Sequence, residues 1–222
     1  MKRDELILFI EQVAKQTISE IATGIDQAAQ SGMALYLSDK GSSRSFIIYN
    51  PGELQRALED PGYEKRLHLN PGKLIVGVID ISHRAKCDGA WVVNTVAAQK
   101  GFGPLMYDIA FSSVGKAGLI SDRDTVSNSA RKIWKYIGAF RKSEFSFFPI
   151  NPENYDCIFP ERHETYLNYR YVLNQPVDTG RLIQRSNEFL KAAESEFPNS
   201  NPIEKLDQLA NKFFNGKNEG WL

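Results

Sequence analysis

The stretch AWVVNTVAAQKGFGPLMYDIAFSSVGKAGLISDRDTVSNSARKIWKYIGAF, residues 90–140, gives the clearest structural pattern in the chain. It begins with a β-branched, apolar run from Trp91 to Val96, which predicts a strand. The strand breaks at Lys100-Gly101-Phe102-Gly103, where two closely spaced glycines let the backbone approach a ligand. Pro104 follows at a position suited to the first turn of a helix. The predicted order is strand, glycine loop, helix.

The residues after Pro104 predict a helix whose first turn faces the same ligand as the loop. We expect Gly115 and Gly118 to end this helix. Unpaired N–H groups and the positive end of the helix dipole favour an anion at a helix N-terminus, and phosphate is the expected one. Apolar residues recur at helical spacing, so one face should pack on a sheet; they are Leu105, Met106, Ile109, Ala110 and Val114.

The second half of the stretch predicts another strand and another helix. Leu119-Ile120-Ser121 is a short strand, and Asp124 or Thr125 is the expected N-cap of the helix that follows. Gly138 is expected to close that helix. Its apolar stripe consists of Val126, Ala130, Ile133 and Ile137. The whole stretch is thus strand, loop, helix, strand, helix.

Two motifs in this unit resemble those of the GNAT superfamily of acyl-CoA-dependent N-acetyltransferases. The family's cofactor motif is Arg or Gln, two residues, Gly, one residue, then Gly or Ala; AQKGFG, residues 98–103, matches both small positions and departs at Ala98. The second motif is Asn, two residues, Ala, three residues, Tyr; SNSARKIW, residues 127–134, keeps this spacing. The resemblance covers roughly residues 74–140 and extends more loosely to about 175.

The resemblance implies an α/β (α+β) fold with a mixed, mostly antiparallel sheet flanked by helices. It also implies direct transfer of an acyl group from acetyl-CoA, or another acyl-CoA, to an amine. A backbone N–H near Thr95 or Val96 would polarise the thioester carbonyl where the strand opens to admit pantetheine. Ser127 would contact the pantetheine arm or only cap its helix. The implied cofactor-binding residues are Thr95, Val96, Lys100, Gly101, Phe102, Gly103, Pro104, Ser127 and Trp134.

The general acid and base are less well defined by the sequence. Family members often place the acid, a tyrosine, where this chain has Trp134, whose indole N–H is far too weak an acid. Tyr136 is the nearest phenol, but two helical residues turn by about 200°, so it should face elsewhere unless the helix is displaced. Asp80, with His83 behind it, is the candidate base. Purely structural roles remain the alternative for each.

Two other functions stay open. One is a GNAT-like protein that binds acyl-CoA or a partner without catalysis, which the missing tyrosine at position 134 favours. The other is a dinucleotide-binding oxidoreductase, since an acid, Asp122 or Asp124, follows Gly101 and Gly103 by about twenty residues. Met106 occupies the place of its third glycine, and the preceding strands suggest an antiparallel meander rather than βαβ repeats.

Composition and charge set limits on domains and partners. The 222 residues are 42% hydrophobic, which suits one domain, residues 33–175, with an amphipathic N-terminal helix (1–32) and a helical extension (176–222). Lys plus Arg and Asp plus Glu are 27 each, so no overall field attracts nucleic acid or a membrane. The default acceptor is a protein or small-molecule amine, and DNA is not excluded through local contacts. The N-terminal helix packs on its own domain or forms a homodimer or partner contact.

Location is predicted from the cysteines and the N-terminus. Cys87 and Cys157 are too few for a disulfide framework and lack metal-ligand spacing with the histidines, so no metal site and a reducing, cytoplasmic compartment are expected. The apolar core of the N-terminus, Leu6 to Ile10, is too short for a signal peptide or a membrane span.

The rest of the chain predicts further elements of the sheet and its covering helices. Residues 33–37 and 45–49 form a hairpin pattern, and the strand 74–81 should pair antiparallel with 91–96. A strand is expected at 166–173. Helices are expected at 51–60, 181–196 and 203–214.

Overall fold

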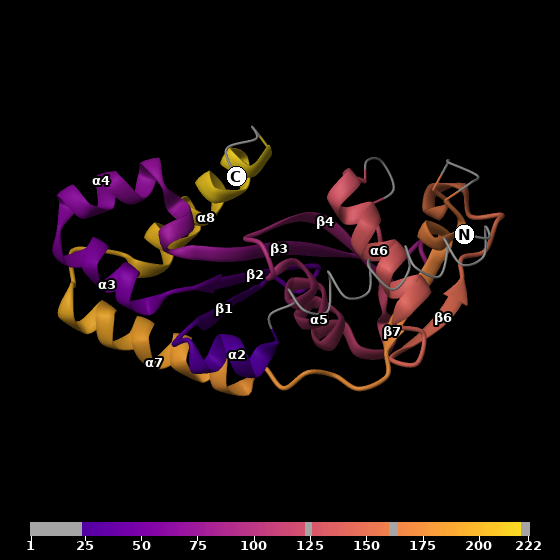
Figure 1. The fold of residues 1–222 in the computed structure, drawn as a ribbon, viewed down its shortest axis with the longest axis horizontal. Helices are drawn as coiled ribbons and strands as arrows, with labels where there is room; N and C mark the ends of the chain where they lie inside the picture. Colours follow the sequence, from indigo (N-terminus) through magenta and orange to yellow (C-terminus); the bar gives the residue numbers. More distant parts are fainter. Residues whose placement is uncertain (1–23, 123–125, 160–163, 219–222) are drawn as a thin grey trace, which may run out of the picture.

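The computed structural model describes residues 24–122, 126–159 and 164–218, which contain a seven-stranded sheet with helices on both faces (Figure 1). The strands are β1 (Ala34–Asp39), β2 (Ser43–Tyr49), β3 (Ile75–Arg84), β4 (Ala90–Ala98), β5 (Leu119–Ile120), β6 (Phe145–Pro149) and β7 (Tyr169–Leu173). Their spatial order is β1-β2-β3-β4-β5-β7-β6. All neighbours are antiparallel except β4 and β5, which are parallel. The predicted mixed, mostly antiparallel α/β fold is confirmed.

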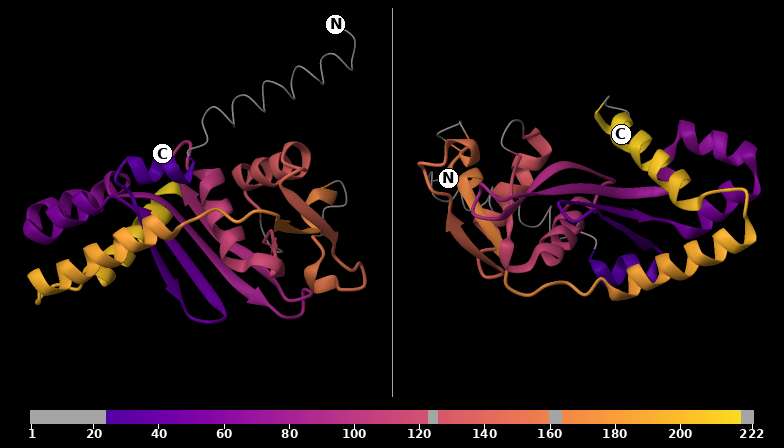
Figure 2. Two further views of the ribbon diagram at one scale, coloured as in Figure 1. Left: turned by 90° about the horizontal axis from the view of Figure 1, so that it is seen from below. Right: turned by 180° about the vertical axis from the view of Figure 1, so that it is seen from behind.

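The helices divide between the two faces of the sheet. They are α2 (Ile25–Gln30), α3 (Pro51–Glu59), α4 (Pro61–Leu69), α5 (Gly103–Val114), α6 (Asn128–Phe140), α7 (Gly180–Glu196) and α8 (Pro202–Asn218). One apolar core joins the sheet to α2, α5 and α6, and a second joins it to α3, α4, α8 and most of α7. Residues 174–179 run as an extended connection from β7 to α7 (Figures 1 and 2).

The two hairpins confirm the expectations drawn from alternating sequence. β1 and β2 pair from Ala34 opposite Tyr49 to Asp39 opposite Arg44, and the turn contains Gly41 at a φ of +77°. β3 and β4 pair antiparallel, as predicted. Hairpins join strands that are close in sequence, so their turn residues and alternation are enough to predict them.

The sequence did not predict two elements, the helix α4 and the strand β6. No helix is predicted between the one at 51–60 and the strand at 74–81, yet α4 begins at Pro61, because proline suits the first turn and the Asp60 carboxylate accepts a hydrogen bond from the Gly62 N–H at 2.7 Å. The aromatic run from Phe145 to Phe148 carries no predicted strand, because aromatic residues there suggest only core packing. It forms β6, which pairs with β7.

The boundaries of α6 differ from the prediction. Ser127 is the N-cap, and its hydroxyl accepts from the Ala130 N–H at 3.2 Å. Asp124 and Thr125, the expected caps, lie outside the described residues. Gly138 does not end the helix, which continues to Phe140. Of the two roles weighed for Ser127, capping is the one observed.

The terminal helices agree with the sequence where the structure describes them. Of the N-terminal helix, residues 1–23 lie outside the described part, and α2 packs Ala28 into the core. The predicted C-terminal helices are confirmed as α7 and α8, which pack on the sheet through Leu190, Leu206 and Phe213. No helix in the described ranges has both the length and the apolar character needed to cross a bilayer.

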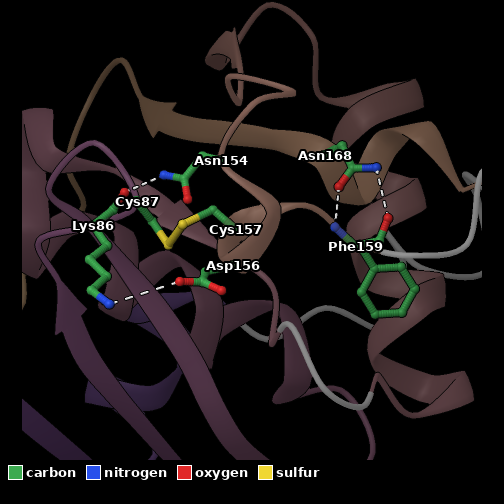
Figure 3. Close-up of a disulfide and its surroundings, with 7 residues drawn as sticks. All are labelled: Lys86, Cys87, Asn154, Asp156, Cys157, Phe159 and Asn168. Carbon is green, nitrogen blue, oxygen red and sulfur yellow. Dashed lines mark hydrogen bonds and ion pairs between the residues drawn. A yellow bond between two sulfur atoms is a disulfide. The ribbon is translucent and has the colours of Figure 1, made fainter.

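Cys87 and Cys157 form a disulfide (Figure 3), although two cysteines were judged too few for a disulfide framework and a reducing compartment was expected. Both side chains are buried, and 70 residues of chain separate them. Asn154 donates a hydrogen bond to the Lys86 carbonyl beside this bridge. Cysteine count and spacing could not reveal the pairing, because the fold brings the β3–β4 turn against the segment that precedes β7.

Candidate functional site

The sheet opens between β4 and β5. These parallel strands pair only at Trp91 with Leu119 and at Val92 with Ile120, and there β5 ends. β4 continues to Ala98, so in the described residues its edge from Val93 onward has no strand beside it on that side. The backbone groups of an unpaired strand edge are available to a ligand.

A β-bulge lies at the same place. Ile81 of β3 pairs with Val93 and Asp80 pairs with Thr95, which leaves Asn94 as an extra residue in β4. The bulge reverses the alternation: Trp91 and Val93 face the core under α5 before it, whereas Val96 and Ala98 face that core after it. Bulges redirect side chains and are common beside active sites.

A cavity of about 260 Å³ adjoins this edge. Its volume is just below the range of small-ligand pockets, and it contains both apolar and polar groups. It opens to solvent and is lined by β4, α5, the start of α6, the end of α8 and Asp122 after β5. The lining residues are Val93, Asn94, Thr95, Val96, Tyr107, Asp122, Val126, Ser127, Ala130, Trp134 and Phe214.

The glycine loop immediately precedes α5, one helical turn before Tyr107 of the cavity. Gly101 has a φ of +91°, a conformation that side chains disfavour. The Phe102 N–H donates to the Gln99 carbonyl at 3.0 Å. The N–H groups of Lys100, Gly101 and Gly103 have no acceptor within the described part of the chain. Three of the four predicted amides are therefore available to an anion.

Gly103 and Pro104 form the first turn of α5, as predicted. A Cβ on Gly103 would lie 3.2 Å from the Ile133 Cδ1, so α6 passes close to this turn. Gln99 holds the loop in place: its side-chain amide donates to the carbonyls of Gly72 at 2.5 Å and Ile75 at 2.8 Å.

The predicted base Asp80 lies next to the cavity rather than in its lining. Its carboxylate accepts hydrogen bonds from the Ser45 hydroxyl at 2.5 Å and from the Thr95 hydroxyl at 2.6 Å. Thr95 lines the cavity and so connects Asp80 to it. Asp207 of α8 adds a second carboxylate nearby: burial raises the pKa of Asp207, Lys40 lowers it and Asp80 raises it.

The structure separates the other candidates for proton transfer. Trp134 is buried and lines the cavity, with its ring against Tyr107, Phe111 and Tyr171. Tyr136 is not among the lining residues and contacts Phe140 instead. His83 is exposed and contacts Trp91, before the sheet opens. Neither Tyr136 nor His83 lies where a cavity ligand would react.

Sequence reasoning missed Tyr107 and the bulge at Asn94. Tyr107 is fully buried, and burial raises the pKa of its phenol. Tyr107 lies within the apolar face of α5, so the sequence could have suggested it as a cavity residue. An aromatic residue on such a face, however, normally indicates core packing. No local pattern marks the bulge.

The chain matches no protein-family model, no curated protein and no solved structure. The geometry of the site is therefore the basis for assigning a function.

Proposed function

We propose that this chain is an N-acyltransferase that moves an acetyl or other acyl group from CoA directly to an amine. The observation that supports it most is the opening of the sheet beyond Val92, directly beside a helix N-terminus. The GNAT resemblance in residues 98–103 and 127–134 supports the same function. An acyl-CoA has both an extended amide-bearing arm and a pyrophosphate, which suit a strand edge and a helix start respectively.

The pantetheine arm would lie against β4. Its amides can exchange hydrogen bonds with the free edge of residues 93–96, as a peptide does when it extends a sheet. The pyrophosphate would bind the loop amides and the first turn of α5. The exposed Lys100 would supply positive charge to it.

The reaction would be attack of a neutral amine on the thioester carbonyl. Asp80 would take the proton of the attacking amine through its position beside Thr95, since its carboxylate accepts hydrogen bonds at 2.5 and 2.6 Å and has further lone pairs. Asp80 and Asp207 together favour a cationic acceptor on this side of the sheet. The acceptor is a protein or small-molecule amine.

A second candidate is acyl-CoA binding without catalysis. It is favoured by Trp134, an indole at the position where the resemblance leads us to expect a phenolic acid. Turnover of labelled acetyl-CoA with a panel of amines separates the two. A dinucleotide-binding oxidoreductase is disfavoured, because the sheet is mainly antiparallel and not doubly wound.

The disulfide changes the expected compartment. A buried Cys87–Cys157 bridge is typical of proteins in oxidising surroundings and counts against the reducing cytoplasm predicted from the sequence. We propose that the protein works where this bridge persists.

The deciding experiment is calorimetric titration of acetyl-CoA into the full chain and into the Gly101→Ala/Gly103→Ala variant. We expect the wild type to bind, and the variant to bind at least about tenfold more weakly. The added Cβ atoms strain the positive φ of Gly101 and push on Ile133.

The matched control is Gly41→Ala. Gly41 also has a positive φ, +77°, with no atom within 4 Å of an added Cβ, and it lies in the β1–β2 turn. It should lose stability without losing affinity for acetyl-CoA. Equal affinity in all three proteins, or no binding to the wild type, would overturn the proposal.

A further inference from the structure

A second cavity lies at the end of the molecule where α6, β6 and β7 meet (Figure 1). Its volume of about 330 Å³ is within the range of small-ligand pockets. It shares no lining residue with the cavity beside β4. We call it the aromatic pocket, and its lining consists of Gly138, Lys142, Phe147, Thr165, Tyr166, Tyr169 and Tyr171.

Most of the wall of the aromatic pocket is ring surface. Four of its seven lining residues are aromatic, and they come from β6, β7 and the short helical turn Thr165–Asn168 that precedes β7. The Tyr166 hydroxyl donates to Glu164 Oε1 at 2.9 Å, and the Tyr171 hydroxyl donates to the Tyr166 carbonyl at 2.5 Å. Since both phenol protons are used within the protein, these two residues present ring surface to a ligand rather than hydrogen-bond donors.

The aromatic rings hold one another in place. Tyr171 is buried, and the rings of Phe147 and Tyr169 stand across it at interplanar angles of 73° and 71°. The Tyr171 ring also contacts Trp134, at a centroid distance of 5.2 Å. A wall that is already packed needs little ordering when a ligand binds.

Gly138 leaves room between α6 and this wall. Glycine within a helix is less stable than alanine, and α6 continues through this position to Phe140. A Cβ on Gly138 would lie 3.2 Å from the Tyr171 hydroxyl oxygen and 3.7 Å from the Tyr166 Cβ. Any larger residue would therefore narrow the pocket.

Charge determines which kind of aromatic ligand suits the pocket. Among the described residues that line it, Lys142 is the only one with a charged side chain, and it is exposed. Glu164, which accepts from Tyr166, does not line the pocket and pairs with Arg131 at 2.9 Å. Aromatic residues can also bind a cation, but Lys142 would repel one. Lys142 would attract an anion instead.

We propose that the aromatic pocket binds a small, planar aromatic carboxylate, with its ring against Phe147 and Tyr169 and its carboxylate at Lys142. Aromatic pairs attract one another beyond the burial of their area, so a flat ring suits this wall better than a saturated ring of the same size. The site is separate from the cavity beside β4 and does not depend on the proposed acyl transfer.

The test is calorimetric titration of three small ligands into the full chain at low salt. Phenylacetate has both the ring and the charge, cyclohexylacetate has the charge without the aromatic ring, and phenylacetamide has the ring without the charge. Phenylacetate should bind about fivefold more tightly than cyclohexylacetate. It should bind about threefold more tightly than phenylacetamide, because the contact with Lys142 is exposed.

Substitutions then locate the ligand. Tyr169→Leu should weaken the binding of phenylacetate about fivefold, and Lys142→Gln should remove the preference for phenylacetate over phenylacetamide. The matched controls are Phe148→Leu and Lys135→Gln, an exposed aromatic residue of β6 and an exposed lysine of α6 that do not line the pocket. Both should bind as the wild type does. Thermal unfolding checks that each variant is folded; if Tyr169→Leu is not, Lys142→Gln and the ligand comparison decide.

Three results would overturn the inference: no binding of phenylacetate, equal affinity for phenylacetate and cyclohexylacetate, or unchanged binding in both pocket variants. Acetyl-CoA takes no part in these titrations, so none of these results bears on the proposed acyl transfer.

Discussion

The paired half of the molecule, β1 to β4 with its two hairpins, contrasts with the open junction, where β4 meets β5 between α5 and α6. In the paired half each strand meets its neighbour along most of its length. At the open junction β5 ends after two residues and a bulge displaces Asn94. The first region is closed by backbone hydrogen bonds, and the second leaves backbone groups and a cavity available to a ligand.

The two regions also differ in what maintains their shape. The paired half is stabilised by strand pairing and an apolar core. The open junction depends on a few specific contacts: the Cys87–Cys157 bridge, the close approach of Gly118 to β7, and the Asp108–Arg141 ion pair at 2.7 Å between α5 and the end of α6. Single changes there should therefore have large effects.

The largest effect is expected from loss of the disulfide, which ties the end of the β3–β4 hairpin to the chain before β7. The bridge closes a loop of 70 residues, so its removal by Cys87→Ala/Cys157→Ala should lower the free energy of unfolding by about 4 kcal/mol. Urea denaturation checks this. Reductant should destabilise the wild type to the same level and leave the variant unaffected; no response of the wild type would show that the thiols are free.

The next largest effect concerns the turn that leads into β5. Gly118 has a φ of +71°, and an added Cβ would lie 2.6 Å from the Tyr171 carbonyl oxygen, a backbone atom that cannot move aside. Gly118→Ala should therefore cost roughly 3 kcal/mol of stability, from backbone strain and overlap together.

Gly115→Ala separates these two causes. Gly115 has a φ of +52° with no atom within 4 Å of an added Cβ, so it has the strain without the overlap. Its cost should be about 1 kcal/mol. Equal losses of stability in the two variants, measured by thermal unfolding, would show that the Tyr171 carbonyl oxygen does not crowd a side chain at position 118.

The same contrast explains what the sequence could predict. The hairpins, the loop at Gly101 and the start of α5 at Gly103 and Pro104 follow from residues that are close together in the chain. The order of the strands around β5, the partner of Cys87 and the bulge at Asn94 depend on pairing between distant segments, and no local pattern specifies them.

The candidate site divides in the same way. Thr95, Val96, Ser127 and Trp134 were expected near a ligand, and the structure places all four around one cavity. Tyr136 was weighed as an acid and lies elsewhere, because 200° of helix separates it from the cavity face, as helical geometry predicts. Tyr107 was missed, since its burial beside the cavity exists only in the folded chain.

An effect on rate rather than on stability is expected for Asp80, which joins the paired half to the junction through Thr95. Asp80→Asn should slow acyl transfer to any accepted amine by roughly a hundredfold, because an amide cannot take a proton. Affinity for acetyl-CoA should not change. The control is Asp156→Asn, because Asp156 is exposed and is not among the residues that line the cavity. Full activity of Asp80→Asn would remove its role as a base.

The smallest effect is a pH dependence of opposite sign in the two regions. At the junction, burial raises the pKa of Asp108 against the opposing effect of Arg141, so the folded state holds this proton above the ordinary value of 3.8. The contribution of Asp108 to stability should therefore decrease as pH rises through the interval above 3.8. In the paired half, the Gly41 N–H lowers the pKa of Asp39, so the contribution of Asp39 should decrease as pH falls below 3.8.

Denaturation of the wild type, Asp108→Asn and Asp39→Asn between pH 3 and pH 7 measures both contributions. Relative to the wild type, Asp108→Asn should gain stability as pH rises, whereas Asp39→Asn should lose it. The same sign in both variants would mean that the carboxylate at the junction is no more buried than the one in the turn, and that the two regions do not differ in solvent access as the structure indicates.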